Sequence, residues 1–198
     1  NPAIRATATV TLVPGPATVV GVAPSSATLE VGSVEAFAAV ALDAYGNLVT
    51  TALTWSANPA IGTITSGGVL TAATTVGSGL VTAALTSNPA VRGTAPVTLV
   101  PGPAATVTIA PPTTVTLAVD ATHAFSAAVA DQYGNAIANP PLTWSVTGGT
   151  GTVDAAGLFT AGHVAGAGTV VAASGTAQRS ASVTVTPGPV AQILVDPP

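Results

Sequence analysis

The sequence predicts an all-β protein that consists of two tandem β-sandwich domains of about seven strands each. Three observations support this prediction. β-Branched residues alternate with small or polar residues in segments such as TVTLV and SVTVT, which is the two-residue period of half-buried strands. Gly or Pro interrupts the chain every few residues, and no segment of ten residues carries a helical apolar stripe. Finally, most of the sequence occurs twice.

The internal repeat predicts the domain boundaries. The segment VPGPA begins at residues 13 and 100, and TPGPV begins at residue 186, so the period is 87 and then 86 residues. We therefore expect one domain at 14–100 and a second at 101–186. The flanks resemble domain ends, so we expect residues 1–13 to be the last strand of a preceding repeat and residues 187–198 the first strand of a following one, paired in cis or in trans.

Turn signals divide the second domain into short strands. The expected strands are 105–110, 114–119, 122–130, 136–146, 151–154, 167–174 and 179–186, and residues 158–161 are left open. Seven short strands in a repeat of 87 residues are typical of an immunoglobulin-type sandwich.

The two copies are most alike in DAYGNLVTTALTWS at 43–56 and DQYGNAIANPPLTWS at 131–145. Asp can accept a hydrogen bond from a backbone amide two residues later, and Gly adopts positive φ without steric cost. The DxYGN segment should reverse the chain between the second and third strands, and LTWS should place its Trp in the third strand, where the side chain points into the core of the domain. The structural residues predicted on this basis are Gly46, Asn47, Trp55, Gly134, Asn135 and Trp144.

These features together resemble bacterial immunoglobulin-like (BIG) repeats of surface proteins and large adhesins. The resemblance rests on a DxxGN turn, a TWS strand, a GxxTA segment and a closing VTVTPGP, in a fixed order and in two copies, and it covers nearly the whole chain. It implies an extracellular, tandemly repeated spacer without catalytic residues. Some relatives in surface pilins form a Lys–Asn isopeptide crosslink, which this chain cannot form because it has no Lys.

Composition excludes several functional classes. Charged residues are only 5% of the chain, its net charge is −4, and its basic residues besides His are Arg5, Arg92 and Arg179. A nucleic-acid partner is not expected, because it requires a basic patch. The absence of Cys excludes disulfides and thiolate metal sites. Apolar runs such as AFAAVAL at 36–42 are far shorter than the roughly 20 residues of a spanning helix, so membrane insertion is not expected.

No catalytic or cofactor-binding residues are predicted, and the chain is not expected to be an enzyme. His123 and His163 have no His counterparts in the first domain and are interpreted as surface residues. Asp43 and Asp131 are the acidic pair at equivalent positions, which makes them the candidates for calcium. Ca²⁺ takes six to eight oxygen ligands, whereas each turn offers one Asp and one Asn, so a turn role is favoured over a metal role.

The sequence favours a structural role as a spacer or scaffold module of an extracellular fibre, filament or stalk protein at the cell surface. The Pro-Gly-Pro links support it, because Pro fixes φ and makes a three-residue link stiff. The alternative is an adhesin or carbohydrate-binding module that uses exposed Thr and Tyr. Tyr45 and Tyr133 are instead expected to cover the end of the core, and the two copies differ little in loop length, which favours the spacer.

The shortage of charge predicts how the surface is used. Surfaces of soluble domains usually carry about 25–35% charged residues. Either the faces of this chain pack against copies of itself or neighbouring repeats in a multi-chain filament, or O-linked glycans on Thr and Ser cover them. We favour packing, because small side chains let two sheets approach closely.

Overall fold

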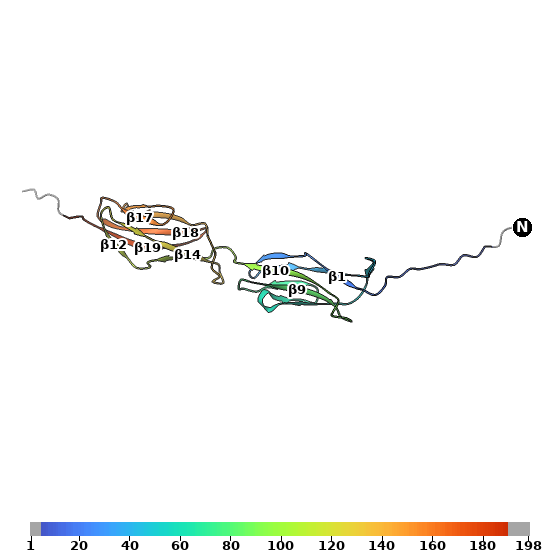
Figure 1. Cartoon of the computed structure of the whole chain (residues 1–198). Helices are drawn as coiled ribbons and strands as arrows, with labels where there is room; N and C mark the ends of the chain where they lie inside the picture. The colour runs from blue at the N-terminus through green and yellow to red at the C-terminus, as the bar shows by residue number, and fades with distance from the viewer. Residues whose placement is uncertain (1–4, 190–198) are drawn as a thin grey trace, which may run out of the picture. The chain divides into compact units, whose positions relative to one another are not determined.

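The computed structural model describes residues 5–189, and the chain divides into two compact units, Asn1–Val100 and Pro101–Pro198. Both units are all-β, which confirms the predicted fold class (Figure 1). Residues 5–13 are exposed and form no strand within the described part of the chain, so their pairing with a neighbouring repeat stays a prediction. Residues 190–198, the expected first strand of a following repeat, lie outside the described residues.

The first unit is built from three sheets. A four-stranded sheet has the order β2-β10-β9-β6, and two three-stranded sheets have the orders β1-β4-β5 and β3-β8-β7. The pairing is antiparallel except between β2 and β10, which run parallel. The described strands are β1 (Val19–Ala23), β2 (Ala27–Glu30), β3 (Val34–Ala36), β4 (Ala38–Leu42), β5 (Leu48–Val49), β6 (Leu53–Ala57), β7 (Gly62–Ile64), β8 (Val69–Ala72), β9 (Gly77–Leu85) and β10 (Arg92–Val100), with a 3₁₀ turn at Pro59–Ile61.

The second unit repeats this topology. Its sheets have the orders β12-β19-β18-β15, β13-β17-β16 and β11-β14, and a bridge between Ala130 and Ala136 stands where the first unit has β5. The described strands are β11 (Thr106–Ala110), β12 (Val115–Ala118), β13 (Thr122–Ala124), β14 (Ser126–Ala130), β15 (Thr143–Thr147), β16 (Gly151–Val153), β17 (Leu158–Ala161), β18 (Gly166–Ser174) and β19 (Ala177–Thr186).

In each unit the chain passes from one sheet to another between its first two strands. In the first unit β1 pairs with β4, and after the cis peptide bond Ala23–Pro24 the chain continues as β2, which pairs in parallel with β10. The second unit makes the same crossing after the cis bond Ala110–Pro111, from β14 to β19. This crossing ties the two layers of each sandwich together.

Two of the expected strands differ from the structure. The expected strand 122–130 is two strands, because the backbone N–H of Phe125 donates to the carbonyl of Gly157 while the segments on either side pair with different strands. The expected strand 136–146 begins only at Thr143, because Pro140 and Pro141 lack amide donors for a ladder. Residues 158–161, left open by the sequence, are strand β17. These divisions raise the strand count above the expected seven per domain.

The core of each unit consists mostly of small and β-branched residues, with a few larger side chains among them. Phe159 in the second unit and Leu70 at the equivalent position in the first are both fully buried. The Phe159 side chain is surrounded by a cluster that includes Val107, Ile109, Phe125, Val129, Val170, Val183 and Val185.

No helix within residues 5–189 has the length and apolar character needed to cross a membrane.

Candidate functional site

The candidate site is the DxYGN turn and its contact with a Pro-Gly-Pro link. In the first unit this turn connects β4 to β5, which is later in the unit than the expected position between the second and third strands, because the preceding segment is divided into more strands. The backbone N–H of Asp43 donates to the carbonyl of Asn47 at 3.0 Å, and the N–H of Gly46 donates to the carbonyl of Asp43 at 3.1 Å. Gly46 has φ +82°, which favours glycine.

The Asp43 carboxylate uses its two oxygens for two different purposes. Oδ1 accepts the backbone N–H groups of Tyr45 and Asn47, both at 2.9 Å, which closes the turn. Oδ2 accepts the backbone N–H of Gly15 at 2.9 Å, from a residue 28 positions earlier in the chain. Gly15 is the centre of the Pro-Gly-Pro link at residues 14–16. The side-chain amide of Asn47 donates to the same carboxylate, at 3.0 Å from Oδ2.

The second unit contains the same arrangement. Oδ1 of Asp131 accepts the backbone N–H groups of Tyr133 and Asn135, both at 2.9 Å, and Oδ2 accepts the backbone N–H of Gly102 at 3.0 Å. Gly102 is the centre of the link Pro-Gly-Pro at residues 101–103. Both carboxylates are buried, with residue exposures of 4% for Asp43 and 1% for Asp131. Each aspartate therefore attaches a link to the unit that follows it.

Another turn in each unit shows that turn formation alone needs only one acceptor oxygen. In the second unit Oδ1 of Asp154 accepts the backbone N–H groups of Ala156 and Leu158, both at 2.9 Å, in the same pattern as Asp131. The first unit has Thr65 at the equivalent place, and its hydroxyl accepts the backbone N–H of Val69 at 3.1 Å. A hydroxyl thus suffices where no link is held. At positions 43 and 131 the second carboxylate oxygen is the one that accepts the N–H of the link.

The hydrogen bonds lower the pKa of both aspartates. The side-chain amide of Asn47 has the largest effect on Asp43, and despite burial its pKa is lowered from 3.8 to about 2. For Asp131 the largest single effect is burial, which raises the pKa, but the donors from Asn135, Gly102 and Tyr133 together outweigh it, and the pKa is lowered. Both groups are therefore carboxylates at neutral pH.

The surroundings of the two carboxylates are those of an anion site and not of a cation site. N–H donors contact both oxygens of Asp43 and of Asp131, so a calcium ion would have to displace them. Among residues 5–189, no three acidic or His side chains gather as a metal site needs.

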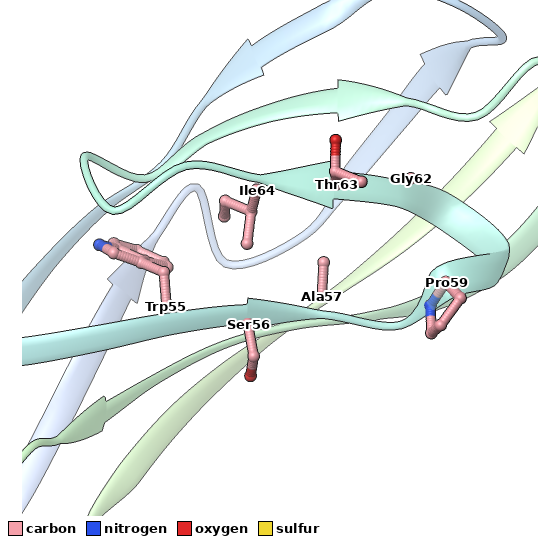
Figure 2. Close-up of a pocket in the computed structure, with 7 residues that line it drawn as sticks. All are labelled: Trp55, Ser56, Ala57, Pro59, Gly62, Thr63 and Ile64. Atoms are coloured by element: carbon pink, nitrogen blue, oxygen red, sulfur yellow. The ribbon is translucent and has the colours of Figure 1, made fainter.

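Trp55 and Trp144 are half-buried, so the expectation of a buried core Trp is wrong in degree. Each indole packs against the core but also covers a glycine of the GxxTA segment: a Cβ on Gly68 would stand 3.0 Å from the Trp55 ring, and one on Gly157 would stand 3.0 Å from the Trp144 ring. Figure 2 shows Trp55 on β6 with Ile64 of β7 beside it, at a shallow open pocket along the side of the sandwich. An indole at this edge is partly exposed because no further strand covers it there.

Two other expectations, for the tyrosines and for His123, need correction or refinement. Tyr45 is 91% exposed and Tyr133 is 46% exposed, so neither covers the end of the core as expected. His163 is exposed as expected, with Nδ1 3.0 Å from a carboxylate oxygen of Asp120. His123 is only half exposed and packs edge-on against Phe125, with ring centroids 5.0 Å apart.

Known proteins share this fold. No protein-family model matches the sequence, and no curated protein matches it. Among solved structures, the Escherichia coli adhesin FdeC is 20% identical over 84% of this chain and 63% of its own, with a TM-score of 0.57. Extracellular cadherin domains 3–6 of protocadherin gamma B2 are 11% identical over 87% of this chain and 52% of their own, with a TM-score of 0.54. Domains 1–6 of the surface layer protein SbsC are 26% identical over 79% of this chain and 24% of their own, with a TM-score of 0.43.

The chain spans less than two thirds of each of these structures. The likeness to FdeC and to the protocadherin is a likeness of fold, and it agrees with the all-β, immunoglobulin-like class that the sequence predicts.

Proposed function

We propose that this chain is a structural module of an extracellular repetitive fibre, filament or stalk protein, built from repeats of the bacterial immunoglobulin-like type. It has no catalytic role in this proposal, and its partners are copies of itself or neighbouring repeats. Two kinds of similarity support it. The motifs of the sequence resemble BIG repeats, and the fold is shared with an adhesin and with extracellular cadherin domains.

The observation that carries the proposal is the attachment of each Pro-Gly-Pro link to a buried aspartate. A spacer must transmit force and keep neighbouring modules in a defined orientation, and a flexible link would prevent both. Here proline fixes φ on both sides of Gly102, and Asp131 holds the N–H of that glycine. The same attachment occurs at Gly15 and Asp43, so it is a property of the repeat. The link thus moves with the unit that follows it.

An Asp131→Asn variant of the full chain tests this role. The amide of Asn has one acceptor oxygen and one donor NH₂, so in either orientation an N–H group faces another N–H group. If its oxygen closes the turn, the NH₂ group opposes Gly102. We expect backbone order at Gly102, measured by ¹⁵N NMR relaxation, to fall, and the two units to reorient more independently than in the wild type.

Two variants serve as matched controls. Asp154→Asn changes a turn of the same geometry, but there only Oδ1 accepts a hydrogen bond within the described residues, so order at Gly102 should not change. Asp43→Asn breaks the attachment at residues 14–16, which does not join the two units, and should leave their relative motion as in the wild type. Equal order at Gly102 in wild type and Asp131→Asn would contradict the role of the attachment.

The cellular setting requires a separate measurement. Antibodies against residues 14–186, applied to intact cells of the source organism and imaged by electron microscopy, should label extended structures outside the cell. Labelling only after cell lysis would refute the proposed location, whatever the result of the linker experiment.

A further inference from the structure

We infer that the outer face of the β1-β4-β5 sheet in the first unit is an interaction surface that binds the same face of a second copy of the chain. The inference rests on the proposed scaffold role, because it names the surface through which copies of the scaffold meet. We call this surface the β1-β4-β5 face, and its residues are Val19, Gly21, Ala23, Ala38, Val40, Leu42 and Leu48.

This face is apolar at every position, although it is exposed. Alternation along β1 turns Val20 into the core and leaves Val19 and Gly21 outside, and β4 and β5 add Val40 and Leu48. Val19 is 53% exposed, Val40 is 45% exposed and Leu48 is 67% exposed. Across β1 and β4, each outward pair is also apolar: Val19 with Leu42, Gly21 with Val40, and Ala23 with Ala38.

The shape of the face is complementary to the same face of a second copy. Gly21, Ala23 and Ala38 form the floor of a shallow hollow that Val22 and Val40 help to line. Leu48 pairs with Leu42 and projects at the Val19 end of the face, away from the hollow. Under a two-fold rotation, the large side chains of one copy can rest over the small residues of the other, as an isologous contact requires. Small residues at the centre also let the two sheets approach closely.

The second unit shows that the fold does not require an apolar surface here. At the positions of Val19 and Gly21 it has Thr106 and Thr108, which stand at the same places in the pairing with β14. Their hydroxyls donate to the carbonyls of Ala130 at 3.4 Å and Ala128 at 3.3 Å. The remaining positions carry Ala110, Ser126, Ala128, Ala130 and Ala136, so the large apolar side chains are absent.

The chemistry of the face favours an apolar partner, and its small size favours a contact that is repeated many times along the chain. No side chain on it carries a charge or a hydrogen-bonding group, so it has nothing to offer a polar ligand. Its exposed apolar area is on the order of a few hundred Å², which is the size of the largest apolar patch on a typical monomer. A stable dimer buries about 800 Å² per partner. A single pair of faces should therefore associate weakly, and many repeats along two parallel chains would make the contact lasting.

Self-association of the full 198-residue chain tests the inference. We expect sedimentation equilibrium from about 10 µM to 1 mM to show a weak monomer–dimer equilibrium, as expected for an interface well below standard size. Val19→Thr combined with Gly21→Thr installs the residues of the second unit and should raise the dissociation constant at least about tenfold, because each change acts twice across a two-fold interface. A Cβ at Gly21 would stand 3.6 Å from Val40, an ordinary contact, so the variant should fold.

The reverse exchange is the matched control. Thr106→Val and Thr108→Gly, combined with Ser126→Ala, Ala128→Val and Ala136→Leu, create the apolar pattern of the first unit in the second and should strengthen association. A wild-type chain that stays monomeric to 1 mM would overturn the inference, and so would association that Val19→Thr with Gly21→Thr leaves unchanged. Asp131→Asn should not alter the dissociation constant, so failure of this interface and failure of the linker attachment give separate results.

Discussion

Replacement of Phe159 by Ala tests whether the two units fold independently around separate cores. The side chain is fully buried, and the edge of its ring lies 2.8 Å from where a Cβ on Gly151 would stand. Truncation to Ala leaves a cavity that the surrounding valines cannot fill, because β-branched side chains are stiff at χ1. The cavity lies wholly inside the second unit, since its lining belongs to that unit's core.

The size of the effect follows from the buried volume that is lost. Truncation of a buried Phe to Ala costs about 3–5 kcal/mol of unfolding free energy. For a unit of this size each kcal/mol lowers Tm by roughly 4–8 °C, so the transition of the second unit should fall by at least about 12 °C. Phe159→Leu installs the residue that the first unit carries as Leu70 and should cost only about 1–2 kcal/mol.

Differential scanning calorimetry of the full chain separates the two units. We expect the transition of the second unit to move down in the order wild type, Phe159→Leu, Phe159→Ala, while the transition of the first unit stays in place. Leu70→Ala should do the converse, with a cost of about 2–5 kcal/mol in the first unit. If both transitions moved together in either variant, the two units would share one cooperative core, and the reasoning from separate clusters would be refuted.

Two further predictions concern the repeated turns. In urea denaturation, Gly157→Ala should destabilise the second unit clearly more than Gly134→Ala. Both glycines have φ near +85°, which costs an L-residue about 1–2 kcal/mol. A Cβ on Gly157 would in addition meet the Phe125 carbonyl and the Trp144 ring, whereas a Cβ on Gly134 would have nothing within 4 Å. Equal losses would contradict the packing of Trp144 on Gly157. Acid titration of stability is the second test. Because folding lowers the pKa of Asp43, its contribution is complete above the ordinary value of 3.8 and is lost as the pH falls toward about 2, so Asp43→Asn should flatten the acid limb of the first unit. An unchanged acid limb in that variant would show that other groups control it.

The sequence was informative wherever a feature is local or repeated. The DxYGN segment predicts its own turn, because the acceptor Asp43 and the donors at Tyr45 and Asn47 lie within five residues. Alternation predicts most strands to within two residues, since side-chain period and burial coincide. The main exception is the expected strand 136–146, which begins only at Thr143, after Pro140 and Pro141.

The features that the sequence did not predict depend on contacts between distant segments. The bond from Gly102 to Asp131 spans 29 residues and has a backbone N–H as its donor, so no side chain at position 102 signals it. A signal was nevertheless present in the sequence. Both copies of the DxYGN turn have aspartate, at 43 and 131, whereas the second turn has Thr65 in one copy and Asp154 in the other. The position of Trp55 beside Gly68 likewise becomes visible only when β6 and the β7–β8 turn are placed together.

The two copies also separate what the fold needs from what the surface does. Both copies keep the two-oxygen aspartate and the indole over glycine, so these belong to the module itself. Val19 and Thr106 occupy equivalent strand positions and pair with the equivalent strands β4 and β14. The valine that follows each of them, Val20 or Val107, is buried in both units, so the core does not depend on the choice between them. A difference that folding does not require, confined to one face and consistently apolar in one copy, indicates a difference in what the two faces contact. Exchanging these residues between the copies therefore tests recognition without changing the fold.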